Sequence, residues 1–87
     1  MVIKQPLRNI LKIIADLSHN DVNTNVFDTA VVERSSLLPT EVNNYLVELS
    51  SLGLIKMLQK VSDAENNKGQ NYRLLNITRE GLHESSA

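Results

Sequence analysis

The stretch that decides the fold is residues 32–55, which read VERSSLLPTEVNNYLVELSSLGLI. Pro39 suits the first turn of a helix, where its missing N–H is not needed, and Gly53 suits the position just after a helix end. Between these two residues, apolar side chains recur every three or four positions, at Val42, Leu46, Leu49 and Leu52. The pattern predicts an amphipathic helix over about 39–52 with one buried face.

Two further helices are expected before this stretch. Apolar residues at helical spacing follow Pro6, at Leu7, Ile10, Leu11, Ile14 and Leu17, and they predict a helix over about 6–18. The polar segment 19–25 has the composition of a loop. A shorter helix is expected over about 26–35, with Phe27, Ala30 and Val31 on one side and Asn25 as its cap.

The pattern after Gly53 changes to that of strands. Residues 54–61 and 72–77 are separated by the polar segment SDAENNKGQN, so we expect a long-tipped hairpin over about 54–77. The alternation of a regular strand puts Lys56 and Lys60 on the same face. Thr78 is a good cap for a short last helix over about 78–84.

Composition limits the kinds of function that are open to the chain. Its 87 residues, 41% of them hydrophobic, suffice for one core, so we expect a single domain over residues 1–87. The sequence has no cysteine, two distant histidines and no glycine-rich phosphate loop, so we expect no enzyme, metal site, cofactor or small-molecule substrate. It also lacks a signal-peptide pattern and a long apolar run, so we expect a cytoplasmic protein without a membrane segment.

Residues 32–55 resemble the turn and third helix of winged helix-turn-helix regulators of archaea and bacteria. The positions that carry the resemblance are Leu37, Pro39, Val42, Tyr45, Leu46, Leu49, Gly53, Leu54 and Ile55. Residues 71–82, NYRLLNITREGL, are similar to the second wing strand and the next helix start in the same group, through Tyr72, Thr78 and Gly81. The chain departs from the pattern at Ser36, where a turn glycine is common, and at Leu38, where a Ser or Thr cap is usual.

The resemblance implies an α+β fold, a winged helix-turn-helix with a three-helix core, a β-hairpin wing and a short C-terminal helix. It also implies that the exposed face of the third helix enters the major groove of DNA. The expected contacts on this helix come from Thr40, Glu41, Asn43, Asn44 and Val47. An Asn amide can bond adenine at two positions, and Thr40 can meet a phosphate or a thymine methyl group.

The charges of the chain are distributed unevenly with respect to the expected DNA-binding surface. The net charge is -1, and the third helix carries Glu41 and Glu48 but neither Lys nor Arg. Attraction between cations and phosphates supplies most non-specific affinity for DNA. The cations that provide it must therefore lie outside the third helix. The hairpin offers four cations, and the resemblance implies that this wing lies along the backbone or minor groove: Lys56, Lys60, Lys68 and Arg73. The alternative is that they are ordinary solvated surface.

The sequence therefore predicts sequence-specific binding of double-stranded DNA by a transcriptional regulator. The resemblance also implies a homodimer on two half-sites, although the sequence offers no obvious dimer helix. The competing hypothesis is a winged helix that serves as a protein-contact module in a transcription or other assembly. An exposed apolar patch that includes Val47 would favour this second function.

Overall fold

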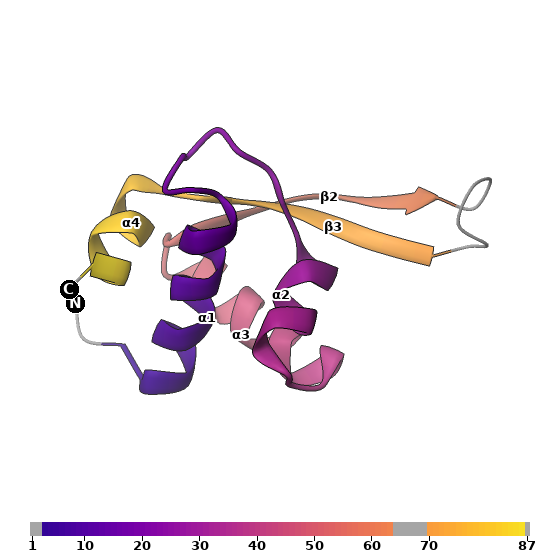
Figure 1. Ribbon diagram of the computed structural model, residues 1–87, viewed down its shortest axis with the longest axis horizontal. Helices are drawn as coiled ribbons and strands as arrows, with labels where there is room; N and C mark the ends of the chain where they lie inside the picture. Colours follow the sequence, from indigo (N-terminus) through magenta and orange to yellow (C-terminus); the bar gives the residue numbers. More distant parts are fainter. Residues whose placement is uncertain (1–2, 64–69, 87) are drawn as a thin grey trace.

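The computed structural model describes residues 3–63 and 70–86. Within these ranges the chain forms four helices and three strands, in the order α1 (Gln5–Leu17), β1 (Val26–Phe27), α2 (Asp28–Ser35), α3 (Pro39–Ser51), β2 (Ile55–Asp63), β3 (Gln70–Ile77) and α4 (Arg79–Ser86). The strands form one antiparallel sheet in the order β1-β3-β2. The fold is an α+β winged helix-turn-helix, in which the β2–β3 hairpin extends beyond the helices and α4 lies toward the other end (Figure 1).

The core lies where α1, α3 and the base of the hairpin meet. The apolar face of α1 that the sequence pattern predicts is buried, except that Leu17 is only partly buried. The predicted face of α3 is buried at Val42, Leu46 and Leu49, but the prediction is wrong for Leu52, which is the C-cap residue and is 37% exposed. The sheet contributes alternate residues from its strands, Ile55, Leu75 and Ile77. These side chains form one continuous cluster, and it holds α3 firmly against the rest of the domain.

The end of α3 is fixed by a local motif. Gly53 has φ +78°, a left-handed conformation that is easy only for glycine. The N–H of Gly53 donates to the carbonyl of Ser50 at 3.0 Å, and the N–H of Leu54 donates to the carbonyl of Leu49 at 3.0 Å. These are the two bonds of a Schellman motif, and they turn the chain from α3 into the wing.

The start of the second helix differs from the sequence prediction. Val26 and Phe27 form the short strand β1, which pairs with Leu75 and Leu74 of β3, and α2 begins only at Asp28. Asn25 does not cap this helix; its side-chain oxygen accepts a hydrogen bond from the Asn76 amide at 2.8 Å. Pairing with a distant strand satisfies the backbone here, and it outweighs the local preference for a helix.

The hairpin also departs from regular alternation. Lys56 pairs with Asn76 and Met57 with Leu75, but Lys60 pairs with Arg73, so the β2 strand contains an irregularity between Met57 and Lys60. One extra residue in β2 shifts the positions that follow to the other face of the sheet. The expectation that Lys56 and Lys60 share a face is therefore wrong, because their partners in β3 lie three residues apart.

The last helix is attached to the end of α3. The hydroxyl group of Thr78 donates toward the carbonyl groups of Gly53 and Leu54, at 2.8 and 3.0 Å, and accepts the N–H of Gly81 at 3.0 Å. Thr78 therefore caps α4, as expected, and also ties it to the turn after α3. At the other end of α4, the Arg8 guanidinium of α1 donates to the carbonyl of Glu84 at 2.7 Å.

Candidate nucleic-acid interface

The exposed face of α3 carries the residues that the sequence singled out. Val42, Leu46 and Leu49 turn inward, so the opposite side of the same helix is left to solvent. The exposed positions in this helix include Thr40, Glu41, Asn43, Asn44, Val47 and Glu48.

Four of these residues form a continuous stripe. Thr40, Asn43, Asn44 and Val47 have the spacing i, i+3, i+4 and i+7, which places them one above another along a single helix face. Glu41 and Glu48 lie about a quarter turn to one side of this stripe, because each residue advances roughly 100° around the axis. We call the four residues the α3 stripe.

The polar groups of the α3 stripe are available to a ligand. Within residues 3–63 and 70–86, the side chains of Thr40, Asn43 and Asn44 form no hydrogen bond with the protein. Other asparagines have structural partners: Asn9 accepts from Gln5, and Asn76 donates to the carbonyl of Thr24 as well as to Asn25. The amides on α3 would therefore exchange only water for a new partner.

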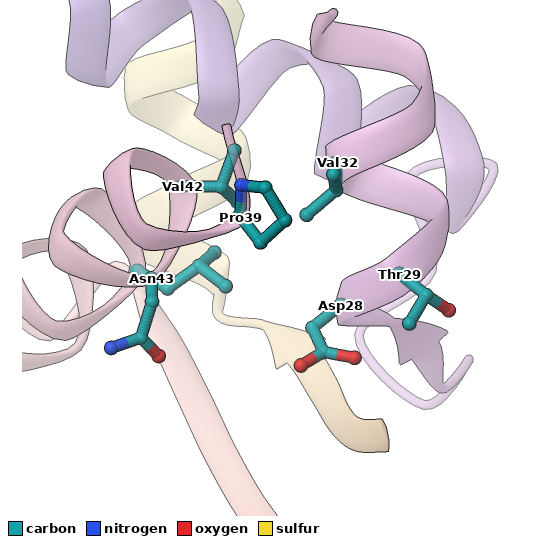
Figure 2. A pocket seen from close by; sticks show the side chains of 7 residues that line it. Asp28, Thr29, Val32, Pro39, Val42 and Asn43 are labelled. Atoms are coloured by element: carbon teal, nitrogen blue, oxygen red, sulfur yellow. The ribbon is translucent and has the colours of Figure 1, made fainter. Parts of the chain in front are cut away.

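A shallow hollow of about 220 Å³ lies beside the stripe, between α2 and α3. It is lined by Asp28, Thr29, Val32, Pro39, Val42, Asn43 and Leu46. Figure 2 shows the Asp28 carboxylate and the Asn43 amide on the same side of this hollow, with Val32 and Pro39 between the two helices. Asp28 and Thr29 thus belong to the same surface as the stripe.

Asp28 also connects this surface to the wing. Its Oδ1 accepts the backbone N–H of Arg73 at 3.0 Å, so the start of α2 is bonded to strand β3. Next to this bond, the rings of Phe27 and Tyr72 meet edge to face, with centroids 5.1 Å apart. Together with the β1–β3 pairing, these contacts set the position of the wing relative to α2 and α3.

The wing cations do not all lie on the same side. Arg73 is half-buried and alternates with Leu75 and Ile77, whose side chains enter the core, so it belongs to the face that carries the helices. Lys56 is exposed and pairs with Asn76, at a position of the opposite face. Lys60 is the register partner of Arg73, but its side chain and the whole of Lys68 lie outside the described residues.

Acidic groups dominate the described part of this surface. Glu41 and Glu48 are exposed on α3, and Asp28 and Glu33 belong to α2. The one basic residue of α2, Arg34, forms a salt bridge with Asp16 of α1.

Sequence reasoning missed Asp28 as part of this surface. Its place near a helix start favours a role in capping, whereas the structure uses its carboxylate to bind the wing. The positions of Asp28 and Arg73 in the sequence do not indicate this contact. It becomes visible only when the fold brings the two residues together.

No group of three or more His, Cys, Asp or Glu residues could hold a metal ion in the part of the chain that the structure describes. None of the helices described is both long enough and apolar enough to cross a membrane.

Two solved structures have the same fold. The reduced form of MarR from E. coli matches with a TM-score of 0.70 and 17% identity, over 97% of this chain and 53% of the MarR chain. ZitR, a zinc-responsive MarR family member from Lactococcus lactis, matches with a TM-score of 0.68 and 15% identity, over 99% of this chain and 51% of its own. The chain thus spans about half the length of these neighbours. At such identities the likeness shows the winged-helix fold alone.

Comparison of the sequence with protein-family models and with curated proteins gives no match.

Proposed function

We propose that the protein binds double-stranded DNA sequence-specifically and regulates transcription, with α3 in the major groove and the wing on the backbone or minor groove. The second helix of a helix-turn-helix is the element that reads base edges in this fold. We propose no catalytic step and no cofactor, and we place the protein in the cytoplasm.

The observation that carries this proposal is the α3 stripe. Two amides and a hydroxyl group stand exposed, without hydrogen-bond partners among residues 3–63 and 70–86, on a helix whose other face is almost fully buried. A helix held this firmly presents its side chains in a fixed register, and such a register is what recognition of successive base pairs requires. Asn43 and Asn44 supply the amides for adenine, and Thr40 supplies a hydroxyl group and a methyl group.

The wing supplies the charge in this proposal. Arg73 lies on the face of the sheet that carries the helices, and its backbone is bonded to Asp28 at the edge of the recognition surface. A cation held here would meet phosphates beside the groove that α3 enters. Lys56, Lys60 and Lys68 would add attraction along the flanking backbone. We propose a homodimer as the bound form, because helix-turn-helix proteins commonly pair two half-sites.

The competing function, docking of a protein partner, is favoured by two observations. Val47 has 52% of its surface exposed in the middle of α3, and Leu38 has 63% exposed at the start of the helix. Glu41 and Glu48 lie beside the stripe that contains Val47, so this side of α3 is acidic and partly apolar and would suit a basic partner.

The experiment that separates the two functions is a titration of Asn44→Ala. Duplexes selected from a random pool by the wild-type protein, and scrambled versions of them, are titrated at two salt concentrations. We expect Asn44→Ala to cost roughly 1–3 kcal/mol on the selected site and almost nothing on scrambled DNA, because amide-to-base bonds carry sequence information and little charge.

Two variants complete this test. Asn23→Ala removes an exposed amide from the loop between α1 and β1, and should leave binding unchanged. Glu41→Gln should tighten binding to all duplexes, since it removes a negative charge near phosphate. Equal behaviour of all variants on all DNA would contradict the proposal and support protein contact.

A further inference from the structure

The chemistry of the α3 stripe also indicates which base pairs it would read. We infer that the centre of the recognised site is A·T-rich, with Asn43 and Asn44 bonding adenines and with Val47 and Thr40 contacting thymine methyl groups. This inference rests on the proposed function and names the sequence class of its ligand.

The amides of the stripe match adenine. In the major groove adenine presents an acceptor at N7 and a donor at N6, and an Asn side chain offers one donor and one acceptor at the matching spacing. Asn43 and Asn44 are both exposed and have no protein partner in the described structure, so neither has to break an internal bond to reach a base.

The apolar groups of the stripe match thymine. Val47 is 52% exposed although it lies in the middle of a helix that packs well on its other face. Its position, three or four residues after the two asparagines, brings its methyl groups to the same groove-facing side. Thymine is the base that presents a methyl group in the major groove, so contact with thymine would bury the exposed surface of Val47.

The residues that read guanine are missing from this face. Guanine presents two acceptors, O6 and N7, and is recognised most often by the donors of Arg or Lys. Helix α3 contains neither residue. Glu41 and Glu48 could accept a bond from cytosine, but they lie to one side of the stripe. A preference for G·C pairs would therefore be confined to the edge of the site.

The test uses chemically altered duplexes of the site that the wild-type protein selects. Replacing thymine by deoxyuridine removes only the 5-methyl group, and replacing adenine by 7-deazaadenine removes only the N7 acceptor. We expect deoxyuridine at the contacted position to weaken wild-type binding about fourfold, as for one buried methyl group. We expect 7-deazaadenine to weaken it by about 5-fold, the lower end of the range of a bidentate contact, because the bond at N6 remains.

Matched variants assign each effect to a side chain. Val47→Ala should bind the thymine and deoxyuridine duplexes equally at one position, while remaining sensitive to 7-deazaadenine. Asn44→Ala or Asn43→Ala should bind the adenine and 7-deazaadenine duplexes equally at one position, while remaining sensitive to deoxyuridine. Sensitivity that persists unchanged in these variants would overturn the assignment of the contacts.

The outcome also separates this inference from the proposed function. A selected site with a G·C-rich centre, or a wild-type protein indifferent to deoxyuridine at every central position, would overturn the A·T inference and leave DNA binding in place. Failure to enrich any duplex above non-specific binding would contradict the proposed function itself.

Discussion

Single residues at the junction of α3, the wing and α4 control how closely these elements pack. Gly81 lies in the first turn of α4, directly over the turn that follows α3. A Cβ atom built on Gly81 would lie 2.1 Å from the carbonyl oxygen of Leu54 and 2.8 Å from the Ile77 side chain. The nearer contact is with backbone, which cannot turn away as a flexible side chain can. The close approach therefore requires glycine at this position.

Gly81→Ala should destabilise the protein by about 1–3 kcal/mol, the usual cost of an overpacked core. The sign of the change in the free energy of unfolding is informative. In a helix without such a close contact, replacing Gly by Ala stabilises by about 1 kcal/mol through helix propensity. Urea unfolding measures the difference, and Glu80→Ala at the exposed neighbouring position is the control. A Gly81→Ala protein as stable as the control would show that α4 does not pack this closely on Leu54.

Residues whose roles depend on local geometry were predictable from the sequence. Gly53 ends α3 through bonds to residues within five positions, and Thr78 caps the helix that directly follows it. Asn25 and Asp28 were not predictable in the same way. Their partners, Asn76 and Arg73, are 51 and 45 residues away along the chain, and the fold alone brings them together.

At the scale of elements, the turn before α3 lacks two features that stabilise such turns. Ser36 has φ 61°, a left-handed conformation that costs a non-glycine residue roughly 1–2 kcal/mol. Leu38 is the N-cap residue of α3 and provides no side-chain hydrogen bond to the helix. These are the two positions at which the chain departs from the winged-helix pattern, so the structure explains why Gly and Ser or Thr are favoured there.

Leu38→Ser should stabilise the protein by about 1 kcal/mol. The backbone of Leu38 is already extended, and its carbonyl accepts the N–H of Val42 at 3.0 Å, so a serine hydroxyl group could accept an N–H of the first turn without rearrangement. Little burial is lost, because Leu38 is mostly exposed. The measurement is the urea midpoint. The control is Leu38→Ala, which removes the leucine side chain without adding a cap. A serine variant no more stable than the alanine variant would contradict the prediction.

The elements themselves were predictable to different degrees. Helices α1 and α3 follow from apolar spacing within one segment, and the exposed stripe of α3 follows from the same spacing. Strand β1 has only two residues and forms because β3 pairs with it, so no local sequence pattern predicts it. The irregularity in β2 likewise depends on the partner strand, and it changes which cations share a face.

The molecule is elongated, and its hairpin projects at one end. Its longest dimension is 41 Å, with the hairpin at one end and α4 toward the other (Figure 1). Helix α4 is bonded to the turn after α3 through Thr78 and to α1 through Arg8, so it holds these two helices together at the end away from the hairpin (Figure 1).

Charge limits the proposed binding of DNA at the scale of the whole molecule. The net charge is -1 and α3 carries two carboxylates and no cation, so in the proposed function the attraction to phosphate comes from the wing. The hairpin register places Lys60 opposite Arg73, and Arg73 is joined through its backbone to Asp28 at the edge of the recognition surface. These two cations are separated by 13 positions in the chain, and it is the shifted pairing of β2 with β3 that brings them together.

Replacing Lys60 and Arg73 together by Ala should weaken binding to selected and scrambled duplexes alike. Each phosphate contact that is lost should also reduce the slope of log K against log salt concentration by about 0.9, because fewer counterions are released on binding. Anisotropy titrations at four or more salt concentrations measure this slope.

The control is Lys12→Ala. Lys12 is an exposed cation of α1 beside the end of α4, so the variant removes one positive charge away from the wing and should leave the slope nearly unchanged. A slope that stays the same in the double variant would show that the wing cations are solvated surface, and an equal fall in the control would mean that only net charge matters.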